Sequence, residues 1–148
     1  TIVGGGSEQS NLEARVDESP AAKRIVLTGS VPYESVAQAY ADADIFVHPG
    51  IWPEPFGRTI LEAMQAGLPV VATNVGGPGE TVRNKRLLCT PRDAQDLAKS
   101  IQYAAKRTEE IGRSNKQYVR EQYHPDVVVP QFVDVYERVL ESKLDNII

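Results

Sequence analysis

Four short, almost continuous apolar runs constrain the fold more than any other feature of this sequence. They lie at residues 24–30 (RIVLTGS), 44–49 (DIFVHP), 69–74 (PVVATN) and 86–90 (RLLCT). Each run is rich in Val, Ile or Leu and is bounded by turn residues, which is typical of parallel strands covered on both faces. Helical patterns separate the runs, so the sequence predicts an α/β fold, a doubly wound open parallel sheet with helices on both faces.

The helical patterns divide into two groups, one between the apolar runs and one after residue 92. The predicted helices span about 34–42, 58–67 and 78–83, and then 93–107, 108–122 and 126–143. The last of them has an apolar stripe at helical spacing, formed by Phe132, Tyr136, Val139, Leu140 and Leu144. Pro130 either kinks this helix or marks its beginning. We expect the stripe to pack on the sheet or on a partner domain.

Length and composition exclude several classes of protein. A chain of 148 residues fits a single domain, residues 1–148, that can bury a sizeable core. Its net charge of −4 gives no electrostatic reason to expect nucleic acid or an anionic membrane surface as a partner. No apolar run approaches the roughly 20 residues that span a bilayer, and no signal peptide is visible. We therefore predict a cytoplasmic protein, peripheral to the membrane if it acts on a lipid.

The first residues, TIVGGG, are typical of the end of a strand running into a glycine turn. They predict a fragment that lacks its first strand. Gly4–Gly6 do not have the G-x-G-x-x-G spacing, so a flexible turn is favoured over a phosphate cradle. His48 and His124 lack the spacing of a metal site, and we expect no bound metal or cofactor. His48 is predicted to be a hydrogen-bonded structural histidine, and the lone Cys89 a small buried residue.

The strongest candidate site follows the second apolar run, in the segment 49–57 (PGIWPEPFG). In open α/β sheets, ligands bind outside the carboxyl ends of the strands. Three prolines stiffen this loop and two glycines let its backbone approach a ligand. Gly57 opens the next predicted helix, whose first N–H groups, at Arg58, Thr59 and Ile60, have no partner within the helix. Such a terminus favours a phosphate.

Two carboxylates flank this predicted anion site. Glu54 precedes the helix and Glu62 lies about one turn into it, so each could accept two hydrogen bonds from a vicinal diol. A phosphate flanked by two diols describes a nucleotide sugar. The alternative is that Glu54 is a solvated loop charge and Glu62 an ordinary helix residue, and the spacing alone leaves both interpretations open.

The segment EPFGRTILE, with its Glu-x7-Glu pattern, resembles the signature of the retaining GT-B glycosyltransferases of family 4. IVGGG, LTGSVPYESVAQAYADADIFVHPG, EAMQAGLPVVATNVGG and YHPDVVVPQFVDVYERVL resemble successive pieces of the C-terminal domain of that family. The resemblance covers nearly the whole chain. It implies a Rossmann-like domain, one half of a GT-B fold, that binds a nucleoside diphosphate sugar.

The resemblance also implies roles for single residues. Glu54, the catalytic candidate, would contact the hexose hydroxyls and Glu62 the ribose hydroxyls. The backbone of Phe56, Gly57, Arg58 and Thr59 would hold the diphosphate or sugar. Val31 and Tyr33 would line the base. The resemblance implies retention of the anomeric configuration, with the donor phosphate acting as base and no metal required.

The sequence departs from the family pattern in three places. An Arg and Lys pair that clamps the diphosphate has no convincing match, although Arg58 could compensate in part. VGGPGE differs from the usual GG-x-P-E, which puts any sugar contact from Gly76 or Gly77 in doubt. The N-terminal acceptor-binding domain, the expected partner of this domain, is missing from the chain.

Two alternatives to a transferase domain remain at this point. One is a non-catalytic nucleotide-sugar-binding or interaction module with the same fold. The other is a GT-B-like epimerase that acts on the nucleotide sugar itself. The sequence identifies neither the nucleotide, nor the hexose, nor the acceptor.

Overall fold

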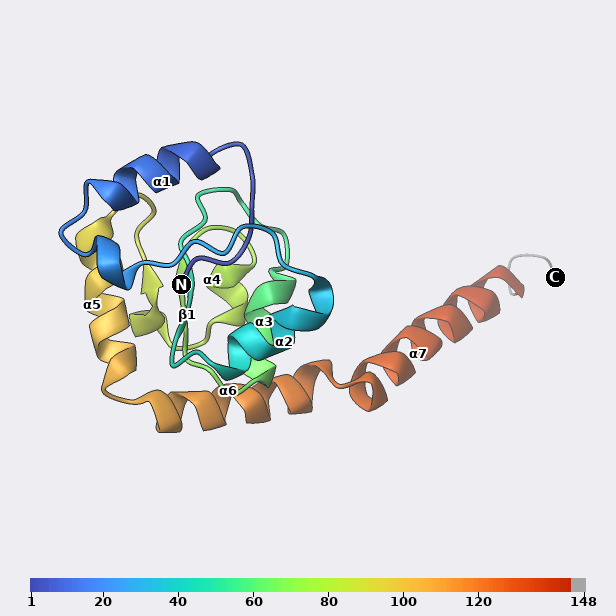
Figure 1. Cartoon of the computed structure of the whole chain (residues 1–148). Helices are drawn as coiled ribbons and strands as arrows, with labels where there is room; N and C mark the ends of the chain where they lie inside the picture. Colours follow the sequence, from blue (N-terminus) through green and yellow to red (C-terminus); the bar gives the residue numbers. More distant parts are fainter. Residues whose placement is uncertain (145–148) are drawn as a thin grey trace. The chain divides into compact units, whose positions relative to one another are not determined.

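The middle strand of a three-stranded parallel sheet forms the centre of the core. The computed structural model describes the backbone of residues 1–144 and the side chains of residues 1–142. The chain divides into two compact units, Thr1–Ala43 and a second unit that begins at Asp44. The sheet belongs to the second unit and has the order β1-β2-β3, with β1 at Phe46–His48, β2 at Val70–Thr73 and β3 at Leu88–Cys89 (Figure 1).

All four residues of β2 are buried. Since side chains along a strand point alternately to the two faces of a sheet, both faces of β2 must be covered. Phe46 pairs with Val70 and His48 with Ala72, and Thr73 pairs with Cys89 on the other side. The parallel α/β sheet predicted from the apolar runs is therefore confirmed, with three of the four runs forming its strands.

The remaining run, residues 24–30, does not form a strand, so the prediction of a strand there was wrong. Ala22–Arg24 is a short 3-10 helix, and the rest of the run makes only isolated bridges, from Leu27 to Ile2 and from Gly29 to Gly4. One bridge is parallel and the other antiparallel, and Gly4 has a φ of 128°. The pairing partner therefore changes direction within three residues, and no continuous ladder can form.

Six helices follow the sequence predictions closely. The first unit contains α2 at Tyr33–Ala41, and the second contains α3 at Arg58–Gln65, α4 at Pro78–Thr81, α5 at Ala94–Ala105, α6 at Thr108–Tyr123 and α7 at Pro125–Leu144. Three elements were not predicted: α1 at Gln9–Asp17 and the 3-10 helix η1 at Ala22–Arg24 in the first unit, and a second 3-10 helix, η2, at Lys85–Leu87 in the second unit. No residue of α1 is buried, so the helix has no apolar periodicity to reveal it.

Helix α3 contributes Ile60, Ala63 and Met64 to the core, and all three are buried. Their i, i+3, i+4 spacing places them on one face of the helix, which packs on β1 and β2. Helix α6 crosses the end of α3 at Gly112, where a Cβ would collide with the carbonyl oxygen of Gly67. Helix packing of this closeness requires glycine at position 112.

Helix α5 packs on β2 and β3 and begins at an N-cap. The Asp93 carboxylate accepts hydrogen bonds from the backbone N–H groups of Gln95 (3.0 Å) and Asp96 (2.9 Å). The lone cysteine, Cys89, is 2% exposed, and its Sγ donates a hydrogen bond to the Ala72 carbonyl oxygen at 3.4 Å. Burial raises the pKa of the Cys89 thiol, as does the charge of Asp96.

Helix α7 begins at Pro125 and continues through Pro130, so Pro130 does not mark its start. The predicted apolar stripe is exposed rather than packed on the sheet, with Phe132 60%, Tyr136 67% and Leu140 62% exposed. The side chain of Leu144, the last predicted member of the stripe, lies outside the described residues. Within residues 1–144, no helix is long and apolar enough to cross a membrane.

Candidate functional site

The loop of residues 49–57 joins β1 to α3 and lies at the carboxyl end of β1, where an open α/β sheet places its ligands. It packs on the loop that follows β2. Glu54 pairs with Gly76 in a parallel backbone bridge, and Gly77 N donates a hydrogen bond of 2.7 Å to the Glu54 carbonyl oxygen. Two loops from neighbouring strands are thereby joined backbone to backbone.

Glycine is required on one side of this contact. A Cβ at Gly76 would lie 2.5 Å from the carbonyl oxygen of Glu54, and one at Gly77 would lie 2.5 Å from the carbonyl oxygen of Pro55. Gly76 also has a φ of 65°, which side chains rarely adopt. Pro78 then begins α4. The pair Gly76 and Gly77, considered in the sequence as sugar contacts, thus has a described role in packing against the Glu54 loop.

Thr73 holds the beginning of the same loop. It is 4% exposed at the end of β2, and its hydroxyl donates a short hydrogen bond to the carbonyl oxygen of Gly50. The His48 carbonyl oxygen lies 3.5 Å from the same hydroxyl. Sequence reasoning missed Thr73, although a polar residue that ends a buried strand is a recognisable signal.

Glu54 is half-buried and its carboxylate lies at the N-terminus of α3. Its Oε1 accepts a hydrogen bond of 3.2 Å from the backbone N–H of Gly57, which is left-handed (φ 81°) and buried. A negative charge at this end of a helix is favoured by the helix dipole and by the unsatisfied N–H groups. The interpretation of Glu54 as a solvated loop charge does not fit this geometry.

The helix terminus differs in one respect from the prediction. Ile60 N donates a hydrogen bond of 2.9 Å to the Gly57 carbonyl oxygen, so this N–H is not available to a ligand. The tight first turn explains the difference, because the left-handed Gly57 aims its carbonyl oxygen at the third residue of the helix. Arg58 and Thr59 are both exposed at the helix start.

Glu62 lies one turn into α3 and is half-buried beside the fully buried Ala63. The structure therefore places Glu54, Phe56, Gly57, Arg58, Thr59 and Glu62 in one segment around the start of one helix. Val31, half-buried, and Tyr33, 77% exposed, belong to the first unit. The site geometry above concerns residues of the second unit only.

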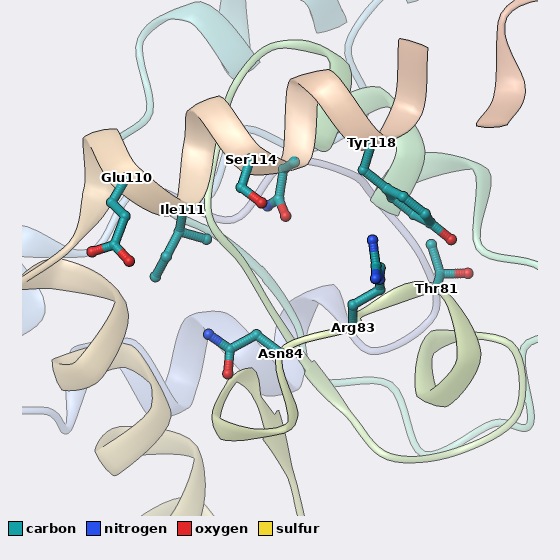
Figure 2. A pocket seen from close by; sticks show the side chains of 8 residues that line it. Thr81, Arg83, Asn84, Glu110, Ile111, Ser114 and Tyr118 are labelled. Atoms are coloured by element: carbon teal, nitrogen blue, oxygen red, sulfur yellow. The ribbon is translucent and has the colours of Figure 1, made fainter. Parts of the chain in front are cut away.

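Pockets outside this segment lie in each of the two units. A pocket of about 380 Å³ in the second unit lies between α6 and the segment after α4 (Figure 2). None of the predicted site residues lines it. A second pocket, of about 290 Å³, lies within the first unit and is lined in part by Gly4–Gly6. The glycine turn thus borders a hollow, although its sequence spacing carries no phosphate signature.

The outcome for His48 differs from its prediction. His48 Nδ1 is buried without a hydrogen-bond partner among the described residues, so the predicted hydrogen bond is not made there. Its ring lies against Gly50, where a Cβ would approach the imidazole Cε1 to 3.1 Å. Among residues 1–144, no group of three His, Cys, Asp or Glu side chains could hold a metal ion.

Known proteins resemble this chain over a region that includes the site segment. The family model described as "Glycosyl transferases group 1" matches residues 1–122. An uncharacterized glycosyltransferase of Methanocaldococcus jannaschii is 30% identical over 145 residues, which cover 95% of this chain and 37% of that protein.

Two solved structures show the same fold. The sucrose-phosphate synthase of Thermosynechococcus elongatus is 30% identical, with a TM-score of 0.82 over 95% of this chain and 38% of that one. HepE of Anabaena, solved in complex with UDP, is 27% identical, with a TM-score of 0.82 over 92% of this chain and 40% of that one.

The chain therefore spans about two fifths of the length of these relatives. The match runs through the Glu-x7-Glu segment, the glycine pair that packs on it and the helix that carries Glu62. On this evidence, the chain belongs to the family of group 1 glycosyl transferases.

Proposed function

We propose that this chain is the donor-binding domain of a retaining glycosyltransferase, which transfers a hexosyl group from a nucleoside diphosphate sugar to an acceptor. The observation that carries the proposal is the placement of Glu54. A half-buried carboxylate is fixed at the N-terminus of α3, and a second carboxylate, Glu62, lies one turn along the same helix.

This arrangement suits a diphosphate flanked by two diols. The start of α3 favours the phosphates through its N–H groups and dipole. Glu54 would accept hydrogen bonds from the hexose and Glu62 from the ribose. HepE, which was solved with UDP and with UDP-glucose, supports a nucleotide sugar as the ligand class. Val31 and Tyr33 of the first unit would contact the base.

The proposed chemistry needs little from this domain besides binding and orientation. The donor phosphate would act as base, so the residues named here hold and orient the donor rather than take the proton. We propose that the acceptor is bound by a further domain of the full-length protein and that the chain itself is a fragment. Because transfer requires donor and acceptor in near-attack geometry, the chain alone should show no appreciable turnover.

Calorimetry with paired ligands tests the two carboxylate roles. A panel of UDP, GDP and ADP, each with and without an attached hexose, first identifies the preferred donor. Glu62→Gln should weaken the binding of the nucleoside diphosphate and of the nucleotide sugar alike, by about tenfold or more, because hydrogen bonds from the ribose to a charged group are lost. Glu54→Gln should weaken the binding of the nucleotide sugar and leave the affinity for the nucleoside diphosphate nearly unchanged.

Glu137→Gln is the matched control, since it removes the same charge from an exposed position on α7. Its affinities should equal those of the parent chain. Equal affinities for Glu62→Gln and the parent would show that the ribose role is wrong. Donor binding by a full-length protein that transfers nothing to any acceptor would favour the non-catalytic module.

A further inference from the structure

Three aromatic side chains join the end of α6 to the loop that carries Glu54. The rings of Phe56 and Tyr123 meet edge to face, with centroids 5.9 Å apart and an interplanar angle of 67°. Tyr118 and Tyr123 meet in the same way, at 5.8 Å and 81°. Such edge-to-face pairs are favourable beyond the area they bury. We call Phe56, Tyr118 and Tyr123 the aromatic cluster.

Polar contacts hold Tyr123 from the side of α6 and α4. The hydroxyl oxygens of Tyr118 and Tyr123 are 3.5 Å apart. This contact, together with burial, raises the pKa of Tyr123 to about 12, and a hydrogen bond involving Thr81 opposes the rise. Arg83 places its guanidinium 5.2 Å from the centroid of the Tyr118 ring. Figure 2 shows the Arg83 side chain pointing toward Tyr118 across the pocket.

The position of Tyr123 is set by the end of a helix. Tyr123 is the last residue of α6, His124 is extended (φ −62°, ψ 141°), and Pro125 begins α7. Proline disfavours a helical conformation in the residue before it, so the helix must stop at Tyr123. The ring is thereby presented at a defined point rather than partway along a helix that could continue.

On the loop side of the contact, the backbone is held but the large apolar side chains are exposed. Ile51 is 53% exposed and Trp52 is 72% exposed, and Phe56 itself is 46% exposed. A Cβ at Gly77 would lie 2.9 Å from the Cα of Phe56, so the backbone of Gly77 already abuts that residue. The Phe56 backbone therefore packs on Gly77. The Phe56 side chain makes its aromatic contact, among the described residues, with the ring of Tyr123.

We propose that Tyr123 is a positioning residue for loop 53–57. Its ring, packed against Phe56, holds the loop backbone, and with it the Glu54 carboxylate, in the conformation that binds the donor. The effect on donor affinity rests on the proposed function, whereas the effect on loop order does not. Holding a loop in its bound conformation before the ligand arrives lowers the ordering cost of binding.

The single tryptophan of the chain, Trp52, directly precedes residues 53–57 within the longer loop 49–57, and its fluorescence reports the motion of this segment. Time-resolved fluorescence anisotropy of Trp52, without ligand, measures the amplitude of local motion on the nanosecond scale. Tyr123→Leu should increase this amplitude and weaken donor binding by about threefold to tenfold, the equivalent of one aromatic pair. Tyr123→Phe keeps the ring contact and should restore both values to within about twofold of the parent.

The control is Tyr136→Leu, which removes a tyrosine that is 67% exposed on α7. It should leave both the anisotropy decay and the affinity unchanged. Far-UV circular dichroism of every variant establishes that the fold is intact. Should Tyr123→Leu fail to fold, Phe56→Leu removes the same ring contact from the loop side and is expected to loosen Trp52 in the same way.

The outcomes separate the two proposals. Trp52 motion unchanged in a folded Tyr123→Leu variant would overturn the positioning role, even if the affinity fell. Increased Trp52 motion in a chain that binds none of the six nucleotides or nucleotide sugars would support the positioning of the loop and contradict the proposed donor. Increased motion with parent affinity would show that loop order does not contribute to binding.

Discussion

Replacing Gly76 by alanine should displace the Glu54 loop, and thereby lower both the stability of the protein and its affinity for the proposed donor. Gly76 has a φ of 65°, and a Cβ there would lie 2.5 Å from the Glu54 carbonyl oxygen. Ordinary contacts begin at 3.4 Å, so the Glu54 loop would have to retreat by 3.4 − 2.5 = 0.9 Å. That movement stretches the 2.7 Å hydrogen bond from Gly77 N to Glu54 and displaces the carboxylate.

The magnitude follows from two terms. A left-handed conformation costs a non-glycine residue about 1–2 kcal/mol. The stretched hydrogen bond costs about 0.5–1.5 kcal/mol more. We expect the free energy of unfolding to fall by about 1.5–3.5 kcal/mol, measured by urea denaturation. Donor affinity should fall by about tenfold or more, measured by calorimetry, because the Glu54 carboxylate would lose its proposed contact with the hexose.

Gly67→Ala is the matched control. Gly67 is also left-handed, with a φ of 87°, but the nearest atom to its Cβ is Lys116 Cδ at 4.0 Å. This variant has the conformational cost of about 1–2 kcal/mol without the collision, and its donor affinity should match that of the parent. If the two variants lost the same stability and kept the same affinity, the backbone contact between Gly76 and Glu54 would have no role in the site.

Two further predictions concern packing and pH. Gly112→Ala should lower the free energy of unfolding by about 1–3 kcal/mol despite alanine's helix propensity, because its Cβ collides with the Gly67 carbonyl oxygen. Urea denaturation against Ser114→Ala, exposed on the same helix, checks this, and a more stable Gly112→Ala would contradict it. The hydrogen bond with Tyr118 and burial raise the pKa of Tyr123 to about 12, so its contribution to stability is fully present below pH 10, the unfolded pKa, and is lost as the pH rises through about 12. Absorbance at the tyrosinate band should show one tyrosine titrating near pH 12, and Tyr123→Phe should remove that step.

The sequence predicts the elements whose signals are local. The runs at 44–49, 69–74 and 86–90 contain the three strands, and α3 begins at Arg58 as the pattern at Gly57 indicates. The strands are shorter than the runs, because backbone pairing stops where the loops turn away while the apolar side chains continue. Strand boundaries depend on partners that a single segment does not contain.

The remaining features depend on contacts between distant segments. Residues 24–30 have the composition of a strand, but within residues 1–144 only Ile2 and Gly4 bridge to them. The candidate site shows the same limit. Its carboxylates stand out by spacing, whereas the packing of Gly76 on Glu54 and of Tyr123 on Phe56 appears only once the chain is folded. A polar or aromatic residue at the end of an element gives no sign of which loop it will meet.

Because the only cysteine of the chain is buried, the opening of the edge strand β3 can be measured in the native protein. Cys89 pairs with Thr73 from β3, and its thiol is both inaccessible and held protonated by its raised pKa. A thiol reagent can therefore react only when β3 opens, and the rate of modification reports the free energy of that opening. The hydroxyl of Thr73 also binds the start of loop 49–57. The rate of thiol modification, measured with and without donor, therefore shows by how much ligand binding raises the free energy of opening of β3.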